Sequence, residues 1–404
     1  MDGGRKKFVK WYFTKNCDLG CAFCHNAYNR KTWGVDSEKD IAVSVAENLR
    51  NSKLVAGLTF LGGEPTYSES FIPACNALRG ADFKFGIVTA GHKLSDLQLS
   101  GLYHNPNLGF IGVSLDSLDS QIVKDIRGRD VFDHQYGGLL NATNTRTRIN
   151  AKYQIYVNII LTSKNALSMN SILDHMHEIG VNKVKILSYN TRDKGSKAAS
   201  ELKLGLTELY EASKSIAQNH DQKKEIWARN GFDVEYNFLS ALAKQYFNDV
   251  EGHSFPTTGH LCPISRDTVF LANDGRLFAC EYFKPYFGID DDNFLGERHD
   301  ICNLLDTNFD DAVEKFYFKT TFYTVANSNL YESLYPCNEC KHLFKTCVPC
   351  GLKGTARSEV TVNEHCNFYK EKLEISGAYQ TRENIRTRLR EPLVKHKTTT
   401  KGVS

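Results

Sequence analysis

The sequence has no long hydrophobic run. No stretch of the 404-residue chain approaches the roughly 18 apolar residues of a membrane-spanning helix, which excludes an integral membrane protein. The N-terminal segment MDGGRKKFVKWYFTK has charge but lacks the apolar core of a secretory signal, so we expect a cytoplasmic protein. Because a reducing cytoplasm keeps thiols free, a disulfide framework is not expected either.

The chain also has little excess charge of either sign. Its formal net charge is +3, and seven basic against two acidic residues in 380–404 give the tail +5, which leaves about −2 on the rest. A folded body so close to neutrality offers no broad phosphate-binding face, so nucleic acid is not an expected partner. We interpret the basic tail as a solvated, charged end of the chain.

Cysteine, in contrast, is abundant and unevenly placed. Of the 12 cysteines, three lie within 17–24, eight lie between Cys262 and Cys366, and Cys75 stands alone. Clustered cysteines in a cytoplasmic chain indicate metal binding. Cys75 falls on an expected helix and suits the core.

Residues 8–190 alternate β-rich runs with helical patterns. This alternation predicts a parallel sheet with helices outside it, either doubly wound or an incomplete barrel. The expected strands are 8–14, 54–61, 83–89, 108–115, 153–161 and 184–189, and the expected helices are about 37–50, 68–79, 95–103, 119–147 and 170–179.

The rest of the chain has a different texture. Residues 194–257 are expected to form a helical connector between an N-terminal domain at 1–193 and a cysteine-rich domain at 258–370. In that domain Gly, Pro, Asn and Cys accompany short apolar runs, as in folds that metal holds together. Residues 371–404 are expected to contain a last helix and the disordered basic tail.

The first cysteine group comprises Cys17, Cys21 and Cys24, directly after the first expected strand. In parallel α/β folds this is the edge of the sheet where chemistry is placed. Three thiolates at such short spacing suit an iron–sulfur cluster, which normally has four, so that one iron would stay open. A structural zinc site, with His25 or a distant side chain as the fourth ligand, is the alternative.

The C-x3-C-x2-C pattern, with an aromatic residue before its last cysteine, resembles the signature of radical S-adenosylmethionine (radical SAM) enzymes. Gly62-Gly63-Glu64-Pro65, at the end of the second strand, resembles the family's GGEP element, whose backbone receives the amino group of the cofactor. Glycine permits the close backbone approach that such a contact needs. The resemblance thus implies cofactor binding at Gly62, Gly63 and Glu64.

Three further segments extend the resemblance to about residues 8–190. Ser114 and Arg127 match a serine and an arginine that engage the ribose and the carboxylate of the cofactor, and a guanidinium suits a carboxylate geometrically. Arg129, close by in the sequence, is the alternative arginine. Thr89 lies where many relatives have Thr-Asn-Gly, although this chain has Thr-Ala-Gly. Asn158 and Ile160, on the fifth strand, are expected neighbours of the adenine.

What the resemblance implies is an α/β fold, a partial (β/α)6 barrel, and radical chemistry. A [4Fe–4S] cluster on Cys17, Cys21 and Cys24 would cleave S-adenosyl-L-methionine into methionine and a 5′-deoxyadenosyl radical. That radical would take a hydrogen atom from an unreactive C–H bond of the substrate.

The second cysteine group resembles the SPASM extension of radical SAM enzymes, a domain with a small β-hairpin and helices that holds two auxiliary [4Fe–4S] clusters. Its inner spacing here is x2, x6, x2, where the family has x2, x5, x3. The family's arrangement gives one cluster to Cys262, Cys280 and Cys350 and the other to Cys337, Cys340, Cys347 and Cys366. Cys302 is either the missing fourth ligand of the first cluster or a buried thiol. Structural zinc is the alternative for the CxxC pairs.

Glu281 follows Cys280 directly, where some SPASM oxidoreductases have an acidic residue proposed to accept a proton from the substrate radical. A carboxylate beside a cluster could remove a proton while the cluster takes the electron. A solvated surface glutamate is the alternative.

We therefore expect a radical SAM/SPASM oxidoreductase that modifies or crosslinks a ribosomally made peptide. The alternative substrate is a small molecule such as an aminocyclitol or a sugar, for a dehydrogenase or an epimerase; a non-catalytic, zinc-stapled binding protein is a third hypothesis. An electron donor such as flavodoxin or ferredoxin is an expected partner. Because the barrel begins at residue 8, a separate protein is expected to present the leader of the peptide.

Overall fold

The computed structural model describes residues 6–24, 38–189, 200–256, 268–278, 300–314, 337–342 and 361–379. By the contacts between residues, the chain divides into two compact units. The first unit comprises Met1–Phe238 and Pro263–Phe322, and the second comprises Leu239–Cys262 and Tyr323–Ser404. The domain boundaries expected from the sequence stay a prediction.

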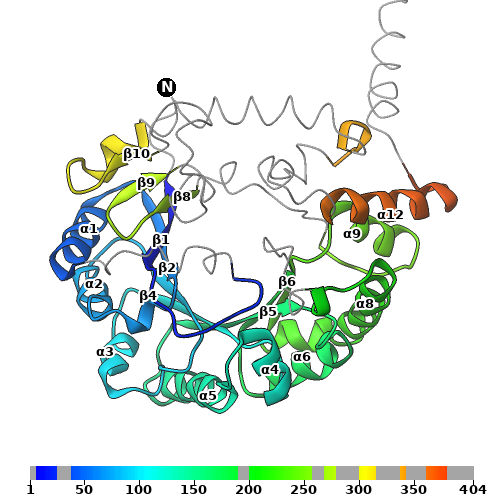
Figure 1. Cartoon of the computed structure of the whole chain (residues 1–404), viewed down its shortest axis with the longest axis horizontal. Coiled ribbons are helices and arrows are strands. Elements are labelled where there is room, and N and C mark those ends of the chain that lie inside the picture. The colour runs from blue at the N-terminus through cyan, green and yellow to red at the C-terminus, as the bar shows by residue number, and fades with distance from the viewer. Residues whose placement is uncertain are drawn as a thin grey trace, which may run out of the picture. The chain divides into compact units, whose positions relative to one another are not determined.

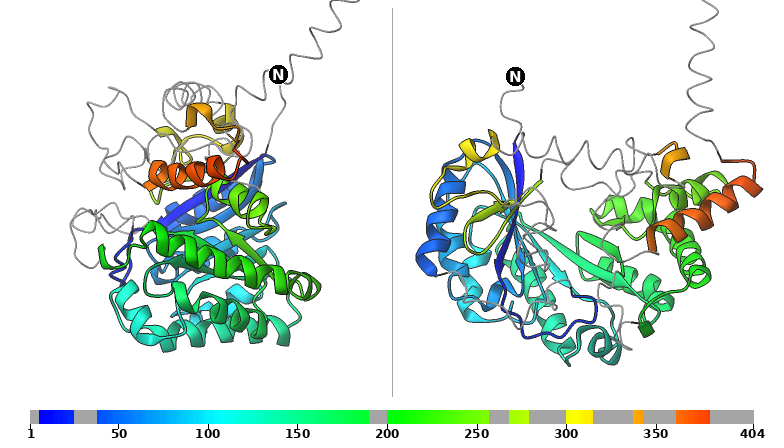
Figure 2. Two further views of the ribbon diagram at one scale, coloured as in Figure 1. Left: turned by 90° about the vertical axis from the view of Figure 1, so that its right-hand side faces the viewer. Right: turned by 45° about the horizontal axis from the view of Figure 1, so that its top comes forward.

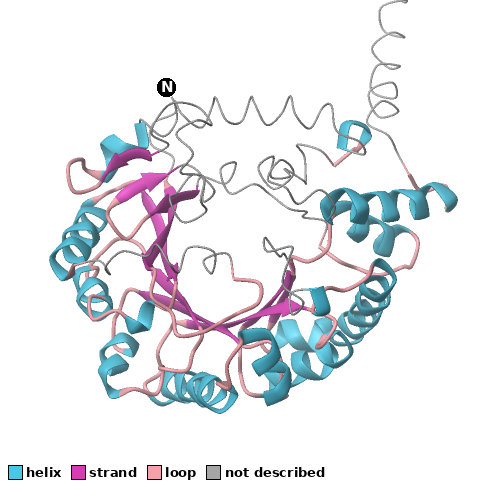
Figure 3. Cartoon of the chain, in the orientation of Figure 1, coloured by secondary structure: helices cyan, strands magenta, loops and turns pink. Residues whose placement is uncertain are grey.

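A curved parallel sheet forms the centre of the first unit, with helices along its outer face (Figure 1; Figure 3). Neighbouring strands are consecutive along the chain from β1 to β7, and each pair is parallel. The strands are β1 (Lys7–Thr14), β2 (Val55–Gly62), β3 (Phe85–Thr89), β4 (Leu108–Ser114), β5 (Gln154–Leu161), β6 (Lys183–Ser188) and β7 (Asp233–Tyr236). The predicted α/β fold with a parallel sheet and a partial barrel is confirmed.

Burial alternates along the strands and shows which side faces the helices. On β5, Ile155, Val157 and Ile159 are fully buried, whereas Tyr156 and Asn158 between them are half-buried. Successive strand side chains point to opposite faces, so the fully buried row packs on the outer helices and the other row lines the inner face. The outer helices are α1 (Lys39–Asn51), α2 (Phe71–Ala77), α3 (Ser100–Tyr103), α4 (Ser120–Arg127), α5 (Phe132–Arg148), α6 (Met169–Glu178) and α8 (Leu206–Arg229), with short 3-10 turns η2 (Pro65–Tyr67), η3 (Leu97–Leu99) and η4 (Ala166–Ser168).

The helical stretch expected over 119–147 is two helices, α4 and α5. Asp119 caps the start of α4, because its carboxylate accepts from the backbone N–H groups of Gln121 and Ile122. Gly128 ends the helix with a φ of 72°, a left-handed conformation that favours glycine. The sequence contained both signals, and the expectation of one continuous helix was wrong.

Strands from later in the chain extend the sheet at both edges. β7 falls within the segment expected to be a helical connector, and it pairs with β6. At the other edge, β8 (Thr268–Leu271) pairs with β1 in parallel and is buried throughout. β9 (Arg276–Phe278) returns antiparallel to β8 as the expected hairpin, and β10 (Asp300–Asn303) pairs with β9. β8 thereby covers an edge of β1 that would otherwise present unpaired backbone groups.

The second unit is helical in its described part. α9 (Ala241–Asp249) packs against α12 (Thr361–Ile375) (Figure 2). Between them the ring of Tyr369 lies 5.7 Å from that of Tyr246 and 5.8 Å from that of Phe247. The short turn η8 (Cys337–Glu339) carries one of the CxxC pairs. None of the helices in the described residues has the length and apolar character to cross a membrane.

Candidate active site

Three cysteines follow β1 directly, in the loop at its carboxyl end. Cys17, Cys21 and Cys24 are half-buried, and no disulfide joins them. Burial raises the pKa of Cys17 to about 12, and the nearby thiols of Cys21 and Cys24 add to the rise. The Cys17 thiol therefore holds its proton until a metal displaces it, and ligation would release that proton.

The chemistry of this donor set fits an iron–sulfur cluster. Thiolate sulfur is the donor that such clusters use, and three thiolates leave one iron open. Within the described parts of the chain, no three His, Cys, Asp or Glu side chains converge as ligands of a single metal ion would. Cys17, Cys21 and Cys24 are the residues that would hold the cluster.

The Gly-Gly-Glu turn after β2 lies against the cysteine loop. The Gly63 N–H donates to the Thr14 carbonyl at 2.7 Å, and the Glu64 N–H donates to the Asn16 carbonyl at 2.7 Å. A Cβ on Gly63 would overlap the Asn16 carbonyl, so only glycine allows this approach. Two motifs that are distant in the sequence are thus brought together, and the backbone of the turn is fixed beside the cysteines.

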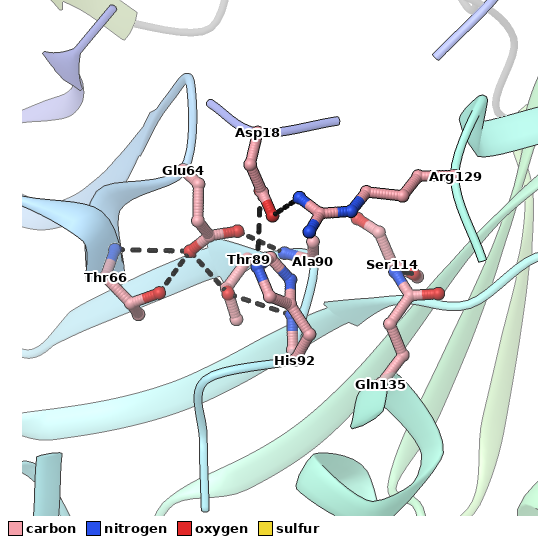
Figure 4. Close-up of polar contacts among 10 residues, drawn as sticks. Asp18, Glu64, Thr66, Thr89, Ala90, His92, Ser114, Arg129 and Gln135 are labelled. Atoms are coloured by element: carbon pink, nitrogen blue, oxygen red, sulfur yellow. Dashed lines mark hydrogen bonds and ion pairs between the residues drawn. The ribbon is translucent and has the colours of Figure 1, made fainter. Parts of the chain in front are cut away.

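The Glu64 side chain is buried at this junction and accepts four hydrogen bonds (Figure 4). Oε1 accepts from the Thr66 N–H at 3.2 Å, from the Thr66 hydroxyl at 2.7 Å and from the Thr89 hydroxyl at 2.7 Å, and Oε2 accepts from the Ala90 N–H at 2.6 Å. Both oxygens are therefore engaged within the protein. Glu64 and Thr89, each predicted to bind the cofactor, join the ends of β2 and β3 to one another.

Arg127, at the last turn of α4, points at the cysteine loop. Its Nε donates to Asp116 Oδ2 at 2.6 Å, its Nη1 lies 3.8 Å from Cys21 Sγ, and its guanidinium carbon lies 5.0 Å from the ring centre of Phe23. Burial opposes the charge on Arg127, but Asp116 outweighs this, so the pKa of Arg127 rises above its usual range. Burial raises the pKa of Cys21, whereas Arg127 opposes that rise and Asp116 adds to it.

The other predicted cofactor residues lie on neighbouring strands. Ser114 ends β4 and pairs in register with Asn158 on β5, and Asn158 and Ile160 both belong to the half-buried row of β5. The Ile160 N–H donates to Asp116 Oδ1 at 2.8 Å, and the Gln135 side chain donates to the Ser114 carbonyl at 3.2 Å. Adjacent placement is established for Ser114 and Asn158, and their cofactor contacts stay predictions.

Several polar residues at this edge were missed by the sequence analysis. Asp18, inside the cysteine motif, pairs with Arg129 at 2.7 Å, and the Nε2 atom of His92 lies 3.3 Å from its Oδ1 (Figure 4). Asp116 is a further missed residue; it is fully buried and accepts from Arg127 Nε and from the Ile160 N–H on β5. Asp18 and Asp116 each lie within a matched motif, but no sequence signal pairs residue 18 with residue 129.

The second cysteine group is only partly described. Cys302 lies on β10 and is half-buried, and it belongs to the first unit. Cys337 and Cys340 are buried in and beside η8, and Cys366 is half-buried on α12, all three in the second unit. Glu281 and the remaining predicted ligands lie outside the described residues: Cys262, Cys280, Cys347 and Cys350.

Comparison with known families supplies the identification. Residues 11–157, which contain both the cysteine loop and the Gly-Gly-Glu turn, match the Radical SAM superfamily. The chain contains a radical SAM domain. Among curated proteins, one of Sulfurisphaera tokodaii named "Probable GTP 3',8-cyclase" is 25% identical to it over 276 residues, and the aligned region covers 67% of this chain and 79% of that protein. An S-adenosylmethionine-dependent nucleotide dehydratase of Selenomonas ruminantium is 23% identical over 39% of this chain and 57% of its own length.

Solved structures with a similar fold include proteins determined with bound peptides. Streptococcus suis SuiB superimposes with a TM-score of 0.56 at 15% identity, over 76% of this chain and 65% of SuiB, and its structure with the precursor peptide SuiA matches equally well. The structure of anSMEcpe with bound AdoMet gives a TM-score of 0.62 at 16% identity, over 91% of this chain and 95% of that one. At these identities the likeness concerns the fold alone.

Proposed function

We propose that this radical SAM protein is an oxidoreductase that oxidises or crosslinks a ribosomally made peptide. The observation that carries the radical chemistry is the junction of the cysteine loop with the Gly-Gly-Glu turn. There the Gly63 N–H donates at 2.7 Å to the carbonyl of Thr14, the last residue of β1, and the Glu64 N–H donates at 2.7 Å to the carbonyl of Asn16 in the loop. A peptide substrate is supported by the fold that the chain shares with SuiB and anSMEcpe, whose structures include bound peptides.

In the proposed reaction the protein binds and orients the reactants. A [4Fe–4S] cluster on Cys17, Cys21 and Cys24 would supply the one-electron reductive cleavage of S-adenosyl-L-methionine that starts C–H abstraction. The buried Glu64 carboxylate fixes the backbone of the turn that would receive the cofactor amino group, because it ties that turn to Thr89. Ser114, Asn158 and Ile160 line the inner strands on which the nucleoside part would lie.

We further propose that the second cysteine group holds two auxiliary clusters, as in SPASM proteins, with Glu281 beside one of them as proton acceptor. Part of this proposal has structural support. Lys370, one turn after Cys366 on α12, pairs at 3.3 Å with Glu339, which lies between Cys337 and Cys340. Three of the four cysteines assigned to one cluster thus belong to elements that contact each other. The assignment of Cys302 to the other cluster stays a hypothesis.

A small-molecule substrate is the second candidate. It is favoured by the sequence relatives, which are named as a probable GTP cyclase and a nucleotide dehydratase, because both names describe reactions of nucleotides. A sugar or aminocyclitol would suit a dehydrogenase or an epimerase built on the same domain. The proposed partners are an electron donor such as flavodoxin or ferredoxin and, for a peptide substrate, a separate protein that recognises the leader.

The test begins with metal content and then asks about substrate. Reconstituted, anaerobically purified protein should contain about 12 iron atoms per chain, since three four-iron clusters are expected. A variant with Cys17, Cys21 and Cys24 all changed to Ser should lose about four of these irons and all cleavage of S-adenosylmethionine. Zinc in place of iron would contradict the proposal.

The substrate is then identified by mass spectrometry with peptides encoded near the gene and with nucleoside triphosphates as separate arms. A peptide product that is lighter by two hydrogens supports peptide oxidation. Conversion of a nucleotide, with every peptide unchanged, would replace the proposed function by the second candidate.

A further inference from the structure

The last turn of α4 is joined to the cysteine loop by backbone as well as by side chain. The Gly20 N–H donates to the Arg127 carbonyl at 3.0 Å, and the Ala22 N–H donates to the Ile126 carbonyl at 3.1 Å. A Cβ on Gly128 would lie 2.6 Å from the Gly20 carbonyl oxygen, so the two segments touch without side chains between them. The helix end and the loop therefore hold one another in register, which fixes where Arg127 can reach.

The Arg127 guanidinium is held rigidly inside this contact. Its side chain is 7% exposed, and the Asp116 carboxylate that holds its Nε is fully buried. Asp116 is fixed in turn, because its second oxygen accepts from the Ile160 N–H and its carbonyl accepts from the Asn165 side chain at 2.8 Å. These hydrogen bonds hold the ion pair in the observed geometry. That geometry directs Nη1 at Cys21 Sγ, 3.8 Å away.

We propose that Arg127 is a positioning residue that sets the reduction potential of the cluster on the cysteine loop, through its N–H···S contact with Cys21 and its charge. Asp116 holds the guanidinium in place and partly offsets that charge. The inference rests on the proposed cluster, whose presence is tested separately by iron and sulfide content.

The physical reason is electrostatic. Reduction adds one negative charge to a cluster, and hydrogen bonds to its sulfurs are among the factors that set its potential. A donor with a full positive charge stabilises the reduced form, and burial strengthens the effect because water does not screen it. The neighbouring Asp116 charge has the opposite sign, so the two residues are expected to shift the potential in opposite directions.

This role differs from the one that the sequence resemblance implies, in which Arg127 binds the carboxylate of S-adenosylmethionine. The structure engages Arg127 with a carboxylate already, that of Asp116 at 2.6 Å. The two roles make different predictions, because one concerns the potential of the cluster and the other concerns the affinity for S-adenosylmethionine.

The experiment is a redox titration followed by electron paramagnetic resonance on the full-length reconstituted protein. The signal followed is the one that changes when S-adenosylmethionine is added, which separates this cluster from any auxiliary cluster. The variants are Arg127→Gln, Arg127→Lys and Asp116→Asn. The matched control is Lys124→Gln, which removes the same charge from an exposed position on the same helix. Affinity for S-adenosylmethionine is measured on each oxidised protein.

Arg127→Gln should make reduction about tenfold less favourable, which is about 59 mV for a one-electron couple. Arg127→Lys should shift it less, Asp116→Asn should shift it the other way, and Lys124→Gln should leave it unchanged. An unchanged potential in Arg127→Gln, with weakened S-adenosylmethionine binding, would overturn the inference. If Arg127→Gln fails to assemble the cluster, Asp116→Asn decides: a less negative potential supports the inference and an unchanged one refutes it.

Discussion

Glu64→Gln removes the charge from the carboxylate that joins the ends of β2 and β3. The substitution changes one oxygen to an N–H donor and leaves the shape of the side chain nearly unchanged. In the native protein, Oε1 accepts from the N–H and hydroxyl of Thr66 and from the hydroxyl of Thr89, and Oε2 accepts from the N–H of Ala90. The amide oxygen can keep the three contacts of Oε1, but the amide nitrogen cannot accept the hydrogen bond that Oε2 accepts. That nitrogen then faces the Ala90 N–H, a donor against a donor.

The expected cost follows from these contacts. A buried N–H without an acceptor costs about 1–3 kcal/mol, and the remaining bonds weaken by up to about 1 kcal/mol each because they lose their charged acceptor. Losing a buried charge returns some free energy, but four donors already solvate the Glu64 carboxylate. We therefore expect a loss of about 3 kcal/mol in the free energy of unfolding, a large share of the roughly 5–15 kcal/mol of a typical domain.

Urea unfolding of the iron-free protein, followed by circular dichroism, measures this loss. With a slope near 3 kcal/mol/M, the midpoint should fall by about 1 M urea. Glu69→Gln is the matched control, because Glu69 is exposed five residues further along. It should shift the free energy of unfolding by no more than about 0.5 kcal/mol. A Glu64→Gln protein as stable as the control would refute the proposed function of this carboxylate as a structural tie.

Three other perturbations test separate parts of the structure. Gly63→Ala should destabilise the protein by about 1–3 kcal/mol and lower its iron content, because a Cβ would overlap the Asn16 carbonyl. Gly101→Ala is the control, since a Cβ at Gly101 would meet open space, and it should change neither quantity. Equal iron content in the two variants would contradict the close approach at Gly63. Burial lowers the pKa of His220, so the folded state favours the neutral ring. The free energy of unfolding should therefore decrease as the pH is lowered below about 6.5, where the ring becomes protonated in the unfolded chain. His220→Gln should reduce this decrease, as measured by urea unfolding at several pH values. An identical pH dependence of the free energy of unfolding in the native protein and the variant would contradict the assignment to His220. Lys183→Met removes the half-buried Lys183 from its pairs with the exposed Asp233 at 3.0 Å and the half-buried Glu235 at 2.8 Å, and should cost about 1 kcal/mol in urea unfolding. Arg229→Met, at an exposed pair, should cost almost nothing.

Much of the first unit was predictable because its signals are local. Each of the six expected strands is present within about two residues of its predicted bounds, since a run of β-branched and aromatic residues identifies a buried strand by itself. The Gly128 boundary between α4 and α5 was equally local and was overlooked. β7 was not predicted, because Asp233–Tyr236 is a four-residue strand within a long helical and polar region.

The placement of later segments depended on distant contacts. The hairpin of β8 and β9 was expected, but its addition to the edge of β1 was not. Phe8 pairs with Thr268 across 260 positions of sequence. No periodicity in either segment predicts that pairing, because the hydrophobic pattern of a strand is the same whichever strand pairs with it.

The sequence by itself determined the parallel α/β sheet, the cysteine loop after β1 and the Gly-Gly-Glu turn after β2, because strand patterns and motif spacings depend only on residues close together in the sequence. Only the tertiary structure decided that Glu64 ties β2 to β3, that Asp18 meets Arg129, and that Asp116 directs Arg127 at Cys21. These contacts exist because parallel strands bring their carboxyl ends to one edge, where loops far apart in the chain meet.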